Sequence, residues 1–214
     1  MKLLWLLFFA VLLAGCASKG KKEELSALPY YHTPDFTPVW LSEKTDSDTL
    51  HTLAPFSFTN QNSVAITSDQ LKGKIHVADF FFTFCPGLCP RLTQSMKEVQ
   101  AAFKDDAEVK LLSYSVMPER DSVAVLRRYA DEHRISGKQW HLLTGEKKAI
   151  YETARRSYFA DENLGVQKRE NDFLHTENFI LVDKNLRIRG IYNGTLPLEI
   201  KQLIEDIKTL KQED

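Results

Sequence analysis

The chain has 214 residues and is 43% hydrophobic, which is enough for one globular domain with its own core plus an appendage. Its 28 basic residues nearly balance its 29 acidic ones, so the composition gives no indication of a nucleic-acid partner or of an acidic one. No internal repeat is visible, so each segment has to form a different part of one fold.

The N-terminus has the pattern of an export signal. Lys2 is followed by the apolar stretch Leu3–Leu13, which is too short to span a bilayer comfortably. Leu13-Ala14-Gly15-Cys16 then resembles the bacterial lipobox, in which cleavage before the cysteine exposes it to lipid attachment. We therefore expect residues 1–15 to be a lipoprotein signal peptide and Cys16 to be lipidated. The protein would then be extracytoplasmic and anchored to a membrane, on the periplasmic side in a Gram-negative cell. The alternative is an ordinary signal peptide that happens to contain a cysteine.

Two segments separate this signal from the main domain. Residues 16–27 are rich in Lys, Glu, Ser and Gly, which is typical of a flexible tether. Residues 28–53 combine aromatic side chains with prolines and predict an extended segment packed over the domain rather than a helix. Its two histidines, His32 and His51, are expected at the surface.

Residues 54–214 are predicted to form one domain in which strands alternate with helices. A hairpin is expected over 55–67, where apolar and polar residues alternate around an Asn/Gln/Asn/Ser turn, and 68–74 should be a connecting turn. A buried strand follows at 75–82, with His76 facing outwards. The later elements expected are helices at 90–103, 121–137, 147–158 and 196–210 and strands at 108–116, 139–143, 176–182 and 187–192. The polar stretch 159–173 has no clear period, and such long excursions are usually functional or mobile.

The most informative stretch is Asp79–Pro90, in which an aromatic strand ends in two cysteines, Cys85 and Cys89. Pro86-Gly87 suits the centre of a type II turn, with glycine at positive φ, and Pro90 suits the first position of a helix. Both thiols would then lie near a helix N-terminus, where the pKa of a thiol is lowered. A thiolate is the nucleophile of disulfide exchange and also a soft ligand for copper(I) or zinc. A redox pair, half of a metal site and a small structural disulfide all remain open.

A cysteine pair at the end of the first long strand, leading into a helix, is the thioredoxin arrangement. Three residues separate these cysteines, however, instead of two. We therefore predict an α/β, thioredoxin-like fold in which helices flank a central sheet and an extra N-terminal hairpin is added.

Three motifs occur together in this domain. They are Cys85-Pro86-Gly87-Leu88-Cys89-Pro90, Ser115-Val116-Met117-Pro118-Glu119-Arg120-Asp121, and His175 ahead of Phe179-Ile180-Leu181-Val182-Asp183. In combination they resemble the SCO/SenC family, whose members are thioredoxin-like copper proteins involved in assembling cytochrome c oxidase. The resemblance covers roughly residues 54–210.

The resemblance implies that Cys85, Cys89 and His175 bind copper, as Cu⁺ or Cu²⁺. Two thiolates and an imidazole make a soft site of low coordination number, and three protein ligands leave one side open for a recipient. The chain departs from the family's pattern at Gly87, where relatives often have Asp, and at Met117, where they also have Asp. Met117 is either a soft axial contact of the metal or filling of the core.

The leading hypothesis is a membrane-anchored copper chaperone that delivers copper to, or prepares, the copper-site subunit of a terminal cytochrome c oxidase. The second is an extracytoplasmic thiol–disulfide oxidoreductase in which Cys85 and Cys89 are the catalytic pair and His175 is dispensable. A redox or copper sensor is a third. A metallochaperone is favoured over an enzyme, but the first two roles are compatible. An oxidised pair cannot bind copper until a reductant, such as a thioredoxin-like protein, reduces it. No nucleic-acid partner is expected.

Overall fold

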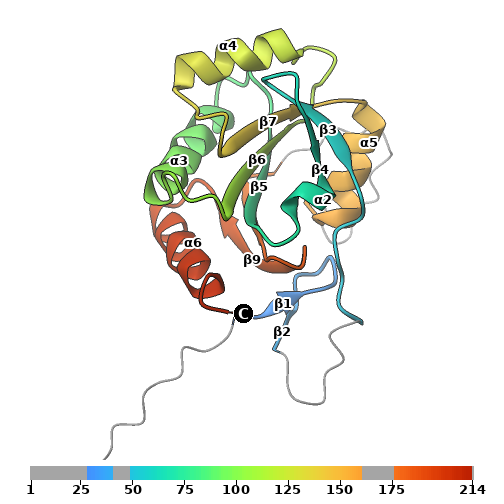
Figure 1. Cartoon of the computed structure of the whole chain (residues 1–214), viewed down its shortest axis with the longest axis vertical. Helices are drawn as coiled ribbons and strands as arrows, with labels where there is room; N and C mark the ends of the chain where they lie inside the picture. Colours follow the sequence, from blue (N-terminus) through green and yellow to red (C-terminus); the bar gives the residue numbers. More distant parts are fainter. Residues whose placement is uncertain (1–27, 41–48, 161–175, 214) are drawn as a thin grey trace, which may run out of the picture.

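The computed structural model describes residues 28–40, 49–160 and 176–213, and these form one sheet with helices on both of its faces (Figure 1). The strand order across the sheet is β2-β1-β9-β8-β5-β6-β7-β3-β4. The strands are β1 (Tyr30–Tyr31), β2 (Pro38–Val39), β3 (Ser57–Asn60), β4 (Ala65–Thr67), β5 (Ile75–Phe81), β6 (Val109–Ser115), β7 (Trp140–Thr144), β8 (Asn178–Val182) and β9 (Ile188–Asn193). The helices are α2 (Ser68–Leu71), α3 (Leu88–Ala102), α4 (Val123–His133), α5 (Lys147–Glu152), the π-helix η2 (Thr153–Ser157) and α6 (Pro197–Leu210).

Strand β5 is central, and its neighbours decide which chain segments meet at its end. It pairs in parallel with β6, from Ile75 opposite Val109 to Phe81 opposite Ser115. It pairs antiparallel with β8, with His76 opposite Val182. The ends of β5 and β6 therefore lie at the same edge of the sheet as the beginning of β8. Because β9 runs back along β8, it ends at that edge too. The cysteine motif follows β5 and lies at this edge.

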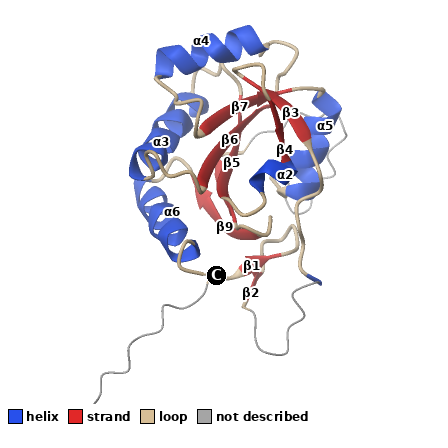
Figure 2. Ribbon diagram, viewed as in Figure 1, coloured by secondary structure: helices blue, strands red, loops and turns tan. Residues whose placement is uncertain are grey.

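The two faces of the sheet carry separate hydrophobic clusters. Helices α3 and α6 lie on one side of the sheet and α2 and α5 on the other (Figure 2). Side chains alternate along a strand, so Ile75, Val77 and Phe81 of β5 join the cluster with α3 and α6, while Ala78 and Phe80 join the other. A strand covered on both faces is apolar nearly throughout, as this one is. The predicted central sheet flanked by helices is confirmed.

The hairpin expected over 55–67 is confirmed as β3 and β4, with Ser57 opposite Thr67. The predicted turn at 68–74 is wrong in one respect, because it contains the short helix α2. A capping box starts this helix: Thr67 accepts from the backbone N–H of the third helical residue, Gln70, whose own side chain bonds back to Thr67 N–H at 3.2 Å.

The outward-facing position predicted for His76 is wrong. β5 lies between β6 and β8 with a covered layer on each face, so it has no outward side, and His76 is fully buried. Its Nε2 lies 3.1 Å from the Tyr158 hydroxyl, which is 3.0 Å from the Tyr114 hydroxyl. His32 is exposed, as predicted, whereas His51 is half-buried and its Nε2 lies 2.8 Å from the Ser157 carbonyl oxygen.

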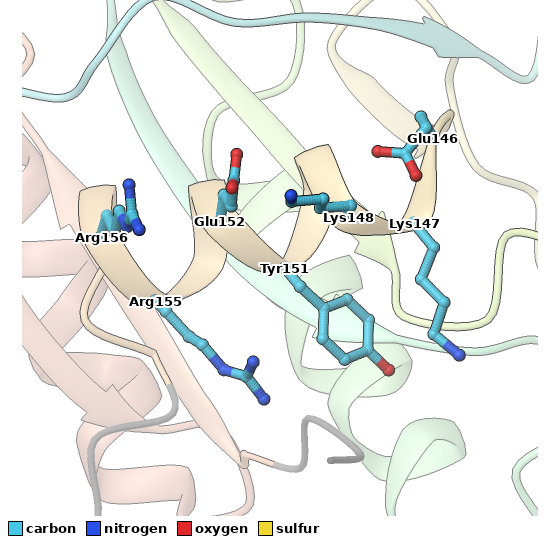
Figure 3. A pocket seen from close by; sticks show the side chains of 7 residues that line it. All are labelled: Glu146, Lys147, Lys148, Tyr151, Glu152, Arg155 and Arg156. Atoms are coloured by element: carbon cyan, nitrogen blue, oxygen red, sulfur yellow. The ribbon is translucent and has the colours of Figure 1, made fainter. Parts of the chain in front are cut away.

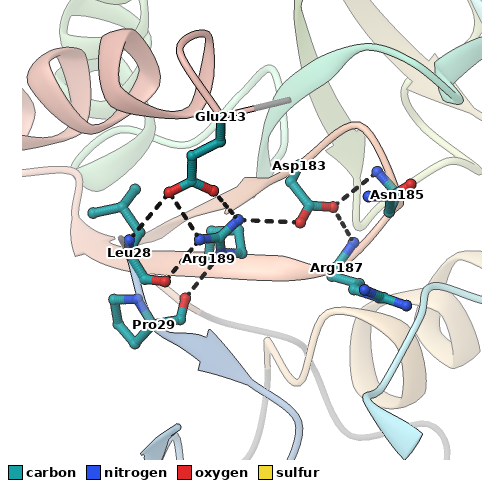
Figure 4. Close-up of polar contacts among 7 residues, drawn as sticks. All are labelled: Leu28, Pro29, Asp183, Asn185, Arg187, Arg189 and Glu213. Atoms are coloured by element: carbon teal, nitrogen blue, oxygen red, sulfur yellow. Dashed lines mark hydrogen bonds and ion pairs between the residues drawn. The ribbon is translucent and has the colours of Figure 1, made fainter. Parts of the chain in front are cut away.

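Residues 28–40 extend the sheet beyond β9, since Tyr31 of β1 pairs with Ile188, and the side chains of Tyr31 and Phe36 pack against the cluster on the α5 face. The buried side chain of Arg189 fixes this segment by donating to the carbonyl oxygens of Leu28 (2.7 Å) and Pro29 (3.1 Å) (Figure 4). It also pairs with Glu213, just beyond α6, so both ends of the described chain meet at β9.

No helix within residues 28–40, 49–160 and 176–213 is long and apolar enough to cross a membrane. The signal peptide, Cys16 and the tether predicted for residues 1–27 lie outside the described residues, and so does His175. The predicted domain boundaries stay a prediction.

Candidate metal centre

Cys85 lies in the loop between β5 and α3, and Cys89 lies in the first turn of α3. Residues 82–87, here called the cysteine loop, turn sharply after β5, and Cys85 N–H donates to the Phe82 carbonyl oxygen at 3.4 Å. Cys89 is the second residue of α3 and is buried at 5% exposure, whereas Cys85 is half-buried. Neither is in a disulfide. The strand and the helix thus bring together the two thiols that the sequence pointed to.

The predicted type II turn at Pro86-Gly87 is wrong. Gly87 has φ −118° and ψ −81°, outside the left-handed region, and it is the N-cap of α3. The helix starts at Leu88, so Pro90 is its third residue instead of its first. A proline is tolerated there because the first four N–H groups of a helix have no intrahelical acceptor. The early start is what places Cys89 inside the helix.

The two thiols differ in acidity. Burial raises the pKa of the Cys85 thiol, but hydrogen bonds from the Cys89, Gly87 and Leu88 N–H groups and from the Cys89 thiol outweigh it, so that pKa lies below its usual value. Burial raises the pKa of Cys89 to about 12. A hydrogen bond from the backbone of Phe82 opposes this rise, and the nearby charges of Cys85 and Asp79 add to it. Cys85 is therefore the more acidic thiol of the pair, and a hydrogen bond from Cys89 favours its ionised form.

The segment before α4 holds the cysteine loop from inside and from outside. Inside, the fully buried Asp121 carboxylate accepts bonds from Thr83 N–H (3.2 Å) and from the hydroxyls of Thr83 and Ser115 (2.6 Å each). Outside, the Arg120 guanidinium lies 3.7 Å from the ring centre of Phe84, which is 40% exposed. Neither Thr83 nor Asp121 was predicted to belong to the site. Asp121 is part of the Ser115–Asp121 motif, which was used only as evidence of the family resemblance.

A second buried carboxylate, Asp79, lies on the α3 face of β5, where its charge acts on Cys89. The Ser113 hydroxyl donates to Asp79 and accepts from Trp140 Nε1 at 2.8 Å. Burial raises the pKa of Asp79 to about 7, and the Ser113 bond opposes that rise. This side chain was also missed, although a single acid within an otherwise apolar strand is a usable signal.

The geometry agrees with comparisons to known proteins. The family model described as SCO1/SenC matches residues 44–212, most of the chain. The chain belongs to the SCO1/SenC family. The SCO1 protein homolog of Bacillus subtilis (strain 168) is 32% identical over 157 residues, which cover 72% of this chain and 80% of that relative.

Two solved structures place this SCO1/SenC chain among known folds. BsSco, described as a member of the Sco family of cytochrome c oxidase assembly proteins with a disulfide switch, gives a TM-score of 0.65 at 31% identity and covers 77% of this chain and 95% of its own. Bradyrhizobium japonicum ScoI, solved with copper bound, gives 0.59 at 27% identity and covers 74% and 99%. The predicted family and thioredoxin-like fold are confirmed.

Met117, one of the two positions at which this SCO1/SenC chain departs from the family pattern, lies on the α5 side of the sheet. Its half-buried side chain packs against the hydrophobic cluster on the α5 face. Cys85 and Cys89 pack with the cluster on the α3 face. This placement on opposite faces of the sheet favours core filling over an axial contact with a metal.

The third predicted ligand, His175, lies outside the described residues, so its distance from the thiols stays untested. Its neighbour Thr176 is described, is buried, and precedes β8 at the edge of the sheet where β5 ends. Among the described residues, no group of three or more His, Cys, Asp and Glu side chains could hold a metal ion. The described part of the site is the cysteine pair.

A hollow of about 280 Å³ on α5 and η2 is a separate feature (Figure 3). Three of its side chains point to the same side of the α5–η2 segment, those of Lys147, Tyr151 and Arg155. The Nζ atom of Lys147 lies 3.1 Å from Glu119 Oε1. The lining is Glu146, Lys147, Lys148, Tyr151, Glu152, Arg155 and Arg156. It includes neither cysteine nor histidine, so it has no soft ligand for copper.

Proposed function

We propose that this SCO1/SenC protein binds one copper ion through Cys85, Cys89 and His175 and delivers it to the copper-site subunit of a terminal cytochrome c oxidase. The observation that carries the proposal is the contact between two thiols at the start of α3, of which Cys85 has the lowered pKa. Thiolates are soft ligands suited to copper(I). A relative at 27% identity has been solved with copper bound.

The sheet topology supports His175 as the third ligand. β8 runs antiparallel to β5, so the chain enters β8 at the edge where β5 leads into the cysteine loop. Thr176, which follows His175 in the sequence, precedes β8 at that edge. An imidazole there would complete a three-coordinate site with an open side, through which a recipient's ligands could replace those of this chain one at a time.

The location follows from the N-terminal sequence. A signal peptide over 1–15, a lipid on Cys16 and a tether over 16–27 would hold the domain at a membrane surface outside the cytoplasm. Disulfides form readily in that compartment. Because a disulfide between Cys85 and Cys89 leaves no thiolate for copper, the proposal requires a reductant, for which a thioredoxin-like partner is suitable.

Copper titration of the reduced protein, in competition with a copper(I) chelator, tests the proposal. We expect one copper per chain, loss of tight binding in Cys85→Ala and Cys89→Ala, and at least about tenfold weaker binding in His175→Ala because one of three ligands is removed. His32→Ala is the matched control, since that histidine is exposed and lies on the β1–β2 hairpin beyond β9. Absence of a tight one-to-one complex, or equal affinity in His175→Ala, would exclude this site.

The acidity difference between the thiols also favours a second candidate, a thiol–disulfide oxidoreductase. The Cys85 thiolate would attack a partner's disulfide, form a mixed disulfide and release one partner thiolate. Cys89 would then lose its proton, attack the Cys85 sulfur and release the second thiolate, so that the pair is oxidised and the partner gains two electrons. This activity needs no imidazole. Turnover that survives His175→Ala while copper binding is lost would identify it.

A further inference from the structure

The position of the cysteine loop depends on a contact between residues far apart in sequence. Thr83 follows β5 directly, and Asp121 stands between β6 and α4. The Asp121 carboxylate accepts both the N–H and the hydroxyl of Thr83, together with the Ser115 hydroxyl. The loop that carries Cys85 is therefore bound to the end of β6 two residues before the sulfur.

The contact is strong because the carboxylate is fully buried. A buried charge is stable only when its oxygens accept hydrogen bonds, and bonds to an ionised acceptor are stronger than neutral ones. Two of the three bonds come from Thr83. If the loop moved away, Asp121 would keep only the Ser115 hydroxyl, so the carboxylate opposes that movement.

Asp121 does not serve to cap its own helix. The N-cap of α4 is Ser122, whose side chain accepts from Val125 N–H. The side-chain partners of Asp121 come instead from the loop after β5 and from the last residue of β6. Ser122 therefore caps α4, whereas Asp121 binds the cysteine loop.

We propose that Asp121 is a positioning residue for the cysteine pair, acting through Thr83. Cys89 is fixed because it is buried within α3, whereas Cys85 lies on the loop and is half-buried. By anchoring the loop at Thr83, Asp121 keeps the Cys85 sulfur within reach of the Cys89 sulfur. Pre-organisation of this kind favours any product that joins the two sulfurs, whether a disulfide or a chelated ion.

The disulfide equilibrium tests this without copper. The full chain in detergent is equilibrated with glutathione, so that the dithiol and oxidised glutathione give the Cys85–Cys89 disulfide and two reduced glutathiones. Alkylation and mass spectrometry then measure the oxidised fraction. For Thr83→Val and Asp121→Asn we expect about a tenfold lower equilibrium constant, equivalent to about 30 mV. Thr83→Ser keeps the hydroxyl and should stay within about twofold of the wild type.

Asp183→Asn is the matched control, because Asp183 is also a buried carboxylate but lies beyond the other end of β5, after β8. It should weaken folding and leave the equilibrium constant unchanged. If Asp183→Asn shifts the constant as much as Asp121→Asn, the effect is a general loss of packing and the proposal fails. Thr83→Val serves if Asp121→Asn does not fold, because it retains the carboxylate and the Ser115 bond. An unchanged constant in Thr83→Val overturns the proposal.

Copper affinity in the same variants extends the test, and this arm alone rests on the proposed function. We expect copper(I) binding to weaken about tenfold in Thr83→Val and to stay unchanged in Thr83→Ser. If the wild type binds no copper while the glutathione constant shifts as expected, the copper function fails and the positioning role stands. If the wild type binds copper and Thr83→Val alters neither quantity, the positioning role fails and the copper function stands.

Discussion

Two buried ionisable side chains on β5 act oppositely on the pH dependence of stability. His76 is fully buried on the α5 face, and burial lowers its pKa to about 3. Asp79 is buried on the α3 face, and burial raises its pKa to about 7 against the effect of the Ser113 bond. Each group is therefore neutral in the folded protein over the mildly acidic range.

The sign of each contribution follows from the unfolded chain. Between about pH 4 and 6.5 an unfolded histidine is protonated and the folded His76 is not, so this group makes stability fall as the pH falls. Over the same range an unfolded aspartate is ionised and the folded Asp79 is protonated, so this group makes stability fall as the pH rises. Each slope is about 1.4 kcal/mol per pH unit, and the two cancel.

Replacing either residue should therefore leave the pH dependence of stability that the other residue contributes. Asp79→Asn should make the free energy of unfolding rise with pH more steeply than in the wild type, by about 1.4 kcal/mol per unit between about pH 4.5 and 6.5. His76→Gln should change the slope by the same amount in the opposite direction. Urea denaturation at several pH values measures both. His32→Gln is the control, because that residue is exposed. Slopes equal to the wild type would show that neither group is held neutral by the fold.

These residues also show what could be predicted from sequence. Cys85 and Cys89 were recognisable because residue type and local spacing carry their chemistry. The burial of His76 was not, since alternation along one strand does not reveal that β5 is central and covered on both faces. The bonds between Asp121 and Thr83 join positions 38 residues apart, and no local pattern encodes such a pair.

At the scale of elements, the turn between β9 and α6 depends on close packing at Gly194. A Cβ added there would lie 2.7 Å from Leu92 Cδ2, 2.7 Å from Phe179 Cε1 and 3.0 Å from the Glu177 carbonyl oxygen. These atoms belong to α3, to β8 and to the segment before β8, so a methyl group would force apart elements at the cysteine edge. Gly87, by contrast, has no atom within 4 Å of an added Cβ.

The two glycines form a matched pair of variants. Gly194→Ala should lower the free energy of unfolding by about 1–3 kcal/mol, because overpacking forces backbone or side-chain shifts. Gly87→Ala should lower it by less than about 1 kcal/mol, since its φ suits any residue and only the N-cap preference changes. Urea denaturation at one pH compares them. If Gly87→Ala lowers the free energy of unfolding as much as Gly194→Ala does, Gly87 has the left-handed conformation of a type II turn instead.

Most elements could be predicted from periodicity because long apolar patterns report which face is covered. The short ones could not: α2 has four residues, too few to show a period, and the π-helix η2 continues α5 without a distinct sequence pattern. The start of α3 was placed late because Pro90 was taken as its first residue. The extension of the sheet by β1 depends on pairing with β9, far along the chain.

At the scale of the whole molecule, Arg189 joins the two ends of the described chain. Its guanidinium pairs with Asp183 (3.3 Å) and Glu213 (2.7 Å), donates to the carbonyl oxygens of Leu28 and Pro29, and lies 4.0 Å from the ring centre of Tyr30. Its side chain is 2% exposed. The N-terminal end of the described chain is therefore bound to the sheet at a defined place.

Arg189→Met should lower the free energy of unfolding by about 3–5 kcal/mol, because it leaves the Asp183 carboxylate buried without its cation. Glu213→Gln should have a smaller effect, since that side chain is 29% exposed and the amide still accepts. Hydrogen exchange should also speed up at residues 28–31 in Arg189→Met, while the disulfide equilibrium of the distant cysteine pair stays unchanged. Lys208→Met removes an exposed ion pair with Glu205 and should shift stability by no more than about 0.5 kcal/mol. If Arg189→Met behaves like Lys208→Met, the N-terminal segment is held by its strand pairing alone.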